Sequence, residues 1–108
     1  MNWTLETLNE EVDKELDALP EDMQARFMRI GRLLERNGPM NVREPHVKPL
    51  FKKLFEMRLR GRDGISRAIY ITITGKRIVV LRIFIKKTQK TPKREIELAL
   101  QRAKELKQ

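Results

Sequence analysis

Hydrophobic residues near the start of the chain recur at intervals of three and four positions, which is the spacing of one face of an α-helix. The first such stripe consists of Leu8, Val12, Leu16 and Leu19. Thr7, with Glu10 three positions later, fits a capping box at the start of this helix. Because proline is tolerated in a first helical turn but not inside a helix, Pro20 ends the stripe and opens a second helix.

The second helix has an apolar stripe of its own, formed by Met23, Phe27, Ile30 and Leu34. It ends near Asn37-Gly38-Pro39, since glycine can adopt the left-handed conformation and proline cannot continue the helix. The two segments therefore predict an N-terminal helical hairpin, and residues 38–50 read as a loop.

Beyond this loop the hydrophobic period falls to two, which is typical of half-buried strands. In LFEMRLR (54–60), the apolar residues Phe55, Met57 and Leu59 alternate with Glu56, Arg58 and Arg60. The segments SRAIYITIT (66–74) and RIVVLRIFIKK (77–87) are rich in β-branched residues, and Gly75-Lys76 between them is a hairpin signal. Three consecutive strands predict an antiparallel meander.

The last segment returns to helical spacing, with Ile96, Ala99, Leu100, Ala103 and Leu106 on one face. Thr91 is its expected N-cap, and Pro92 its first helical residue. The predicted fold class is therefore α+β: an N-terminal helical hairpin, a three- to four-stranded antiparallel meander and a C-terminal helix, in one domain spanning residues 1–108.

In this fold we expect helices to cover one face of the sheet and water to cover the other. The alternation in the first predicted strand places Arg58 and Arg60 on the open face or at its rim. Arg67 shares a face with three isoleucines, but it lies at the beginning of its strand, where a long side chain can reach out past the core.

The composition excludes several classes of protein. The chain has no cysteine, which excludes disulfide frameworks, thiol nucleophiles and thiolate zinc sites. Its single histidine, His46, cannot form a metal centre by itself, so we expect no metal. No apolar run approaches the roughly 20 residues that span a bilayer, and the first residues are acidic where a signal peptide is basic. These features predict a soluble, cytoplasmic protein.

The net charge of +9 is unevenly distributed along the 108 residues. Residues 1–36 hold five Lys and Arg against nine Asp and Glu, a net charge of −4, whereas residues 37–108 hold 19 against six, a net charge of +13. Such asymmetry indicates a polyanionic partner, although a solvated cationic surface is the alternative. An anionic membrane is a weaker fit, because the cations lie on strand-like segments and not on one amphipathic helix.

The densest basic segment is KKTQKTPKR (86–94), where the last strand gives way to the last helix. Cations are disfavoured at a helix N-terminus, where unpaired N–H groups already present positive charge. Their accumulation there is explained if an anion such as phosphate binds, and the alternative is a solvated loop without a ligand. Aromatic residues make up only 6% of the chain, so its composition favours contacts to phosphates over base stacking.

Three stretches, LFEMRLR, GISRAIY and VVLRIFIKKTQKTPKREIELALQRAKE, resemble the RelE/ParE toxin superfamily, specifically its HigB-like, phage-associated branch. The resemblance implies a small antiparallel sheet packed on helices, with an N-terminal strand that here could only be residues 3–7. It implies the toxin of a type II toxin–antitoxin pair, acting as a ribosome-dependent, metal-independent mRNA endoribonuclease without a cofactor. The expected partners are a helix-turn-helix, HigA-like antitoxin, the ribosome and mRNA. The alternatives are a ParE-like inhibitor of DNA gyrase and a non-catalytic nucleic-acid-binding domain.

The resemblance also assigns roles to individual residues. It implies that Arg67 and Lys87 stabilise the charge of the transition state, and that Arg58 or Lys86 takes part in proton transfer or phosphate positioning. The expected RNA-binding residues are Arg60, Lys90, Lys93 and Arg94. The chain departs from the family pattern at Ser66, where an aromatic residue is common, and it lacks a C-terminal catalytic tyrosine, so the general acid and base stay unassigned.

Overall fold

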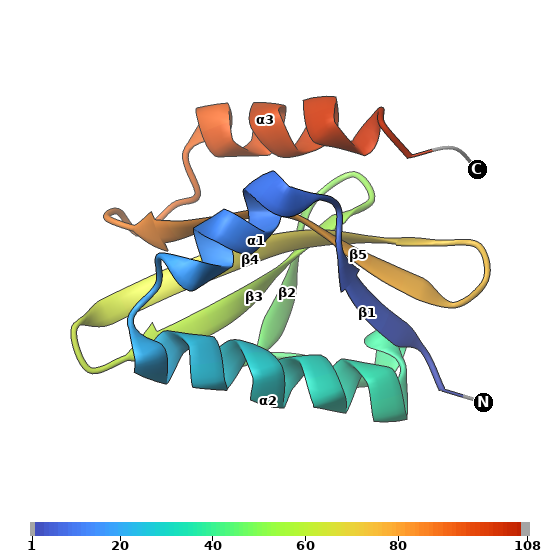
Figure 1. The fold of residues 1–108 in the computed structure, drawn as a ribbon, viewed down its shortest axis with the longest axis horizontal. Coiled ribbons are helices and arrows are strands. Elements are labelled where there is room, and N and C mark those ends of the chain that lie inside the picture. Colours follow the sequence, from blue (N-terminus) through green and yellow to red (C-terminus); the bar gives the residue numbers. More distant parts are fainter. Residues whose placement is uncertain (1, 107–108) are drawn as a thin grey trace.

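Five strands form one mixed sheet in the order β1-β5-β4-β3-β2 (Figure 1). The computed structural model describes residues 2–106. In chain order the elements are β1 (Thr4–Thr7), α1 (Glu10–Asp17), α2 (Glu21–Asn37), the short 3-10 helix η1 (Pro39–Asn41), β2 (Val47–Phe51), β3 (Leu54–Gly61), β4 (Gly64–Ile73), β5 (Arg77–Lys86) and α3 (Lys93–Ala103). Strands β2 to β5 pair antiparallel with one another, and β1 pairs parallel with β5.

The sheet is larger than predicted, although the meander β3–β4–β5 is confirmed. Its second turn contains Gly75 and Lys76, both with the left-handed backbone angle that a tight turn requires. The expectation of a loop over residues 38–50 is wrong, because residues 47–51 form β2 and pair with β3. Pro49 conceals this strand in the sequence, since proline cannot donate to a ladder, but an edge strand needs partners on one side only.

The N-terminal strand implied by the family resemblance is present as β1. Its parallel pairing with β5 makes the sheet mixed, so the prediction of a purely antiparallel sheet of three to four strands is wrong. Because β1 precedes the helices, no helical hairpin opens the chain. Instead α1 packs mainly on β5, while α2 packs on β3 and β1.

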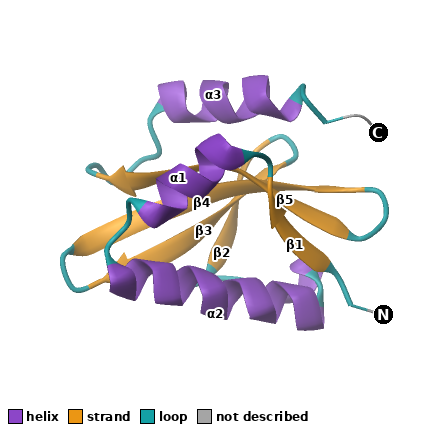
Figure 2. Ribbon diagram, viewed as in Figure 1, coloured by secondary structure: helices purple, strands orange, loops and turns teal. Residues whose placement is uncertain are grey.

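Helices cover both faces of the sheet, with α1 and α2 on one face and α3 on the other (Figure 2). The prediction of one covered and one open face is therefore wrong. The reason lies in β4 and β5, which carry apolar side chains on both faces, as strands buried on two sides do. Towards α1 and α2 these are Ala68, Tyr70, Ile78, Val80 and Ile83. Towards α3 they are Ile69, Ile71, Ile73, Val79 and Leu81.

The ends of two helices differ from the predicted caps. The N-cap of α1 is Asn9, whose side-chain oxygen accepts a hydrogen bond from the backbone N–H of Val12 at 3.2 Å, and not Thr7. Helix α3 has Pro92 as its N-cap, because the Thr91 hydroxyl is bonded to the sheet instead. Among residues 2–106, no helix is long and apolar enough to cross a membrane.

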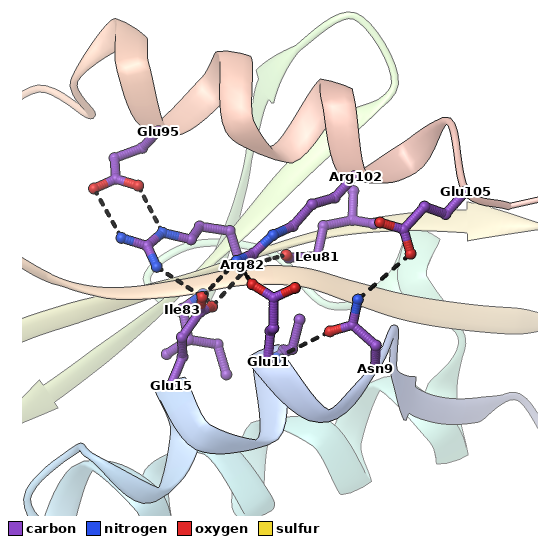
Figure 3. Close-up of polar contacts among 10 residues, drawn as sticks. Asn9, Glu11, Glu15, Leu81, Arg82, Ile83, Glu95, Arg102 and Glu105 are labelled. Atoms are coloured by element: carbon purple, nitrogen blue, oxygen red, sulfur yellow. Dashed lines mark hydrogen bonds and ion pairs between the residues drawn. The ribbon is translucent and has the colours of Figure 1, made fainter.

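A network of ion pairs, formed by Glu15, Arg82, Glu95 and Arg102, ties α1 and α3 to β5 (Figure 3). Arg82 donates to Glu95 at 2.7 Å and to Glu15 at 2.8 Å. Arg102 donates to Glu15 at 2.8 Å and to the carbonyl of Leu81, also at 2.8 Å. We call these four residues the ion-pair network.

Glu15 also completes the edge of β5. Its carboxylate accepts the backbone N–H of Ile83 at 3.0 Å, beyond the point where β1 stops pairing with β5. Burial raises the pKa of Glu15, but hydrogen bonds from Arg102, Ile83 and Arg82 outweigh it and hold that pKa below its ordinary value. The network thereby fixes the first turn of α3 relative to the last strand.

Candidate functional site

The strand register brings basic residues from three strands together. Arg58 of β3 lies directly opposite Arg67 of β4. In the next row, Ile65 of β4 lies between Arg60 of β3 and Lys86 of β5. Neighbouring strands are about 4.8 Å apart, so these side chains rise from a small area of one face. Like charges directly opposite each other destabilise a sheet, and the fold tolerates this cost at Arg58 and Arg67.

These residues surround a cavity of about 440 Å³, which we call the basic cavity. It is lined by Arg58, Gly64, Ile65, Arg67, Lys86, Lys87, Thr88 and Gln89. This lining, all of it within the described part of the chain, contains four cations and no carboxylate. All four predicted catalytic residues thus meet in one place. The turn residue Gly64 has a φ of 139°, which favours glycine at the mouth of the cavity.

Arg67 lies deeper than the sequence predicts. Its side chain is 1% exposed and forms an ion pair with Glu56, which is 0% exposed, so it does not extend into water past the core. Glu56 lies two residues before Arg58 on β3, on the same face and diagonal to Arg67, within reach of a long side chain. The Nε atom of Arg67 is buried without a hydrogen-bond partner in the described structure, so the protein leaves this donor unsatisfied.

Glu56 also holds the basic loop of residues 87–92. Its second carboxylate oxygen accepts the hydroxyl of Thr91 at 2.6 Å, and the ammonium of Lys48 lies 3.8 Å from the first. One buried carboxylate therefore orients Arg67 and anchors the loop that carries Lys87. Hydrogen bonds therefore occupy both of its carboxylate oxygens.

The electrostatic environment lowers the pKa of Lys86. Partial burial is the largest cause, and the nearby charge of Arg67 adds to it, while Glu56 acts in the opposite direction. Burial likewise lowers the pKa of Arg67, against the attraction of Glu56. A lysine shifted in this direction gives up its proton more readily, which suits a group that exchanges protons.

The four predicted RNA-binding residues lie in hollows that adjoin the basic cavity. Arg60 lines a hollow of about 80 Å³ together with Arg58, Arg26 and His46. Lys90, Lys93 and Arg94 line another of about 470 Å³, which shares Lys87 and Thr88 with the basic cavity. The predicted residues thus line the basic cavity and two hollows that adjoin it, and these together form one connected basic surface. Among residues 2–106, no group of three His, Asp or Glu side chains could hold a metal ion.

The sequence reasoning missed Glu56 and Thr91 as residues of the site. The strand alternation identifies Glu56 only as a polar member of its strand, and the sequence predicts Thr91 as a helix cap. One signal was available: a carboxylate shares its strand face with Arg58 and Arg60, so a buried pair with a cation of the next strand is a natural expectation. The partner could be identified only with the register.

Known proteins match both the sequence and the fold. The family described as "Phage derived protein Gp49-like" matches residues 14–104. The "Probable endoribonuclease HigB1" of Mycobacterium tuberculosis is 32% identical over 91 residues, which cover 84% of this chain and 70% of that protein. The same values hold for the protein of a second strain of this organism.

The fold of this chain also matches a solved structure. The chain matches a structure described as an archaeal RelE-RelB complex from Pyrococcus horikoshii with a TM-score of 0.58 and 25% identity, over 81% of this chain and 98% of that one. The expected resemblance to RelE-like and HigB-like toxins is thereby confirmed. The chain belongs to the Gp49-like family of phage-derived proteins.

Proposed function

We propose that this protein is the toxin of a type II toxin–antitoxin system, a metal-independent endoribonuclease that cleaves mRNA on the ribosome and so inhibits translation. Residues 1–108 act as one toxin domain. The observation that carries the proposal is the basic cavity, where four cations from three strands and one loop converge without a carboxylate in the lining. The relative named as a probable endoribonuclease supports the same activity.

The reaction needs three kinds of help, and lysine and arginine side chains can supply each, with a lysine accepting a proton only in its neutral form. The 2′-hydroxyl must lose its proton as it attacks the neighbouring phosphorus, the pentacoordinate phosphate must be stabilised, and the departing 5′-oxygen must gain a proton. The products are a 2′,3′-cyclic phosphate and a 5′-hydroxyl, and no external water or metal enters this step. Positively charged donors aimed at the phosphate stabilise the charge that develops in the transition state.

The geometry suggests how the work is divided. Arg67 and Lys87 stabilise the phosphate charge, and Arg67 does so from a side chain held rigidly by Glu56. Lys86 takes part in proton transfer, since its pKa is lowered. Arg58 positions the phosphate, because a guanidinium binds phosphate through two parallel hydrogen bonds and does not readily give up a proton.

The two hollows beside the basic cavity bind RNA on either side of the cleaved bond. Arg60 on one side, and Lys90, Lys93 and Arg94 on the other, contact neighbouring phosphates of the message. An acidic, helix-turn-helix, HigA-like antitoxin covers this surface, and complementary charge speeds its capture. The neighbour solved as a RelE-RelB complex supports a partner of this kind.

The test is induction of the protein without its antitoxin, followed by mapping of mRNA ends. We expect growth arrest and cleavage within translated messages, with cyclic phosphate ends. The double variant Lys86→Ala/Lys87→Ala removes this cleavage, whereas the control Lys52→Ala/Lys53→Ala, at the exposed β2–β3 turn, retains it. Intact messages together with trapped gyrase–DNA complexes would establish the gyrase alternative. Intact messages with salt-dependent RNA binding would leave a non-catalytic domain.

A further inference from the structure

One flank of α2 carries four arginines: Arg26, Arg29, Arg32 and Arg36. At 100° per residue they fall within an arc of roughly 120° on the helix surface, and they extend over about 15 Å of its length. Arg26 is half-buried at the border of the apolar stripe, and the other three are exposed. The net charge of −4 over residues 1–36 conceals this flank, because the nine acids of that segment outnumber its five cations.

Of the three carboxylates of α2, Glu21 and Asp22 lie in its first turn, and Asp22 is on the same side of the helix as the arginines. Asp22 accepts the backbone N–H of Arg62 at 2.6 Å, in the β3–β4 turn. Glu35 accepts the backbone N–H of Leu5 at 2.8 Å and lies on the opposite side of the helix from Arg26. Across the ion pairs formed within residues 2–106, none includes any of the four arginines. Beyond the first turn, where Glu21 and Asp22 lie, Arg29, Arg32 and Arg36 therefore face no paired carboxylate in the described part of the chain.

The flank is continuous with the basic cavity. Arg26 lines the same small hollow as His46, Arg58 and Arg60, and Arg58 and Ile65 belong to both this hollow and the basic cavity. A nucleic acid that leaves the cavity past Arg60 therefore meets Arg26 first and then the exposed arginines farther along the helix.

We propose that this arginine flank of α2 is a second RNA-binding surface, which holds the phosphate backbone of base-paired RNA next to the strand in the basic cavity. The inference deepens the proposed function and rests on it. Arginine favours phosphate because its planar donors bind two oxygens at once. Spacing of three to four residues places a guanidinium on successive turns of one helix face, which suits a regular backbone. Continuity with the basic cavity, which the proposed function assigns to RNA, favours RNA over an acidic protein as the occupant.

The test compares two RNA probes that cannot be cut, because their single-stranded part carries 2′-deoxyribose. One probe is a 12-nucleotide single strand, and the other is the same strand joined to a 10-base-pair RNA hairpin. We expect the hairpin to raise the affinity of the wild-type protein about tenfold. The triple variant Arg29→Gln/Arg32→Gln/Arg36→Gln should lose this gain, while its affinity for the single strand stays within about twofold of the wild type. For the hairpin probe, the slope of log affinity against log salt concentration should become shallower by about two to three.

Two controls keep the result specific. Lys52→Gln/Lys53→Gln/Lys76→Gln removes the same charge from exposed turns and should keep the tenfold gain. Arg29→Lys/Arg32→Lys/Arg36→Lys keeps the charge and should retain most of the gain, which separates lost charge from lost folding.

Several outcomes would overturn the inference. These are a hairpin that adds no affinity to the wild type, an equal loss in the triple variant and the lysine control, or an equal loss for both probes. Unchanged RNA binding with weakened antitoxin capture would assign the flank to a protein partner instead. The probes measure binding, whereas the induction experiment measures cleavage. A failure of this inference can therefore be distinguished from a failure of the proposed function.

Discussion

Strand β5 connects two groups of charged residues that are built on opposite principles. In the ion-pair network, Arg82 and Arg102 are matched by Glu15 and Glu95. The basic cavity begins at Lys86, which lies four residues after Arg82 on the same strand. Its residues Arg58, Lys86 and Lys87 take part in none of the ion pairs formed among residues 2–106. Matched charges serve to hold helices on the sheet, whereas unmatched charges stay available for an anion.

We expect the largest effect from substitution of Glu56, the carboxylate that pairs with Arg67 beside the basic cavity. It gives the basic cavity its one internal pair, so Glu56→Gln should leave Arg67 as an uncompensated buried charge. We expect a loss of about 3–5 kcal/mol in the free energy of unfolding, measured by chemical denaturation. Cleavage should fall as well, because the guanidinium loses its fixed position.

The matched control is Glu97→Gln on the exposed side of α3, which should change stability by less than about 0.5 kcal/mol. If Glu56→Gln were as stable and as active as the wild type, Glu56 would hold neither Arg67 nor the loop.

Glu15 tests the matched side of the comparison. Its carboxylate serves two arginines and a backbone N–H, so Glu15→Gln should cost about 2–3 kcal/mol at neutral pH, with cleavage per folded molecule largely unchanged. Because folding lowers the pKa of Glu15, its contribution is full above the ordinary value of 4.5 and is lost as the pH falls through the lowered value.

Denaturation curves at several pH values check this prediction. The gap between wild type and Glu15→Gln should narrow in acid. The exposed residue Glu10 offers a control in the same helix, where Glu10→Gln should cost less than about 1 kcal/mol. A gap that stayed constant down to the acid limit would contradict the assigned direction of the shift.

Thr91 sharpens the comparison, because it links the basic loop to the one carboxylate of the site. Thr91→Val keeps the side-chain shape and removes the 2.6 Å hydrogen bond to Glu56, which should cost about 1–2 kcal/mol. The loop then loses its anchor, so we expect slower cleavage under single-turnover conditions with little change in RNA affinity.

The matched control is Thr88→Val, whose exposed hydroxyl bonds only within the loop, to the carbonyl of Lys90. Equal effects of the two variants would mean that the loop needs its internal bonds and not its attachment to Glu56.

The smallest expected effect is a shift in the pH profile of cleavage. Arg58 contributes to the lowered pKa of Lys86, so Arg58→Gln should raise that pKa and move the rising limb of the rate to higher pH. The readout is the midpoint, since Arg58 also positions the phosphate and its loss lowers the rate at every pH. Lys52→Gln should leave the midpoint in place, and an unmoved midpoint in Arg58→Gln would exclude Lys86 as the titrating group.

Local periodicity predicted much of this fold. The stripes of α2 and α3 and the alternation of β3 depend on neighbours along the chain, and these elements were placed correctly. Strand β2 and the two covered faces could not be found in the same way. Pro49 hides the pattern of the edge strand, and the burial of β4 on both sides depends on α3 folding back over Ile69 and Ile71.

The residues of the candidate site show the same difference between local sequence patterns and long-range contacts. The strand alternation singled out Arg58, and the density of basic residues singled out Lys86 and Lys87, whereas their roles in catalysis come from the family resemblance. The role of Glu56 depends on a diagonal contact across two strands, and that of Thr91 on a loop that returns to the sheet. Such contacts are set by register, which a single sequence does not specify.

The parallel pairing of β1 with β5 has a consequence for the synthesis and folding of the chain. Among the described strands, β1 is synthesised before the other four, but its partner in the sheet is β5, which follows them all, and β5 also brings Lys86 to the site. Such long-range pairing closes late, because the intervening chain must first be ordered. A nascent chain that ends before β5 therefore lacks Lys86 and Lys87, so its basic cavity stays incomplete until β5 and the loop after it have been synthesised.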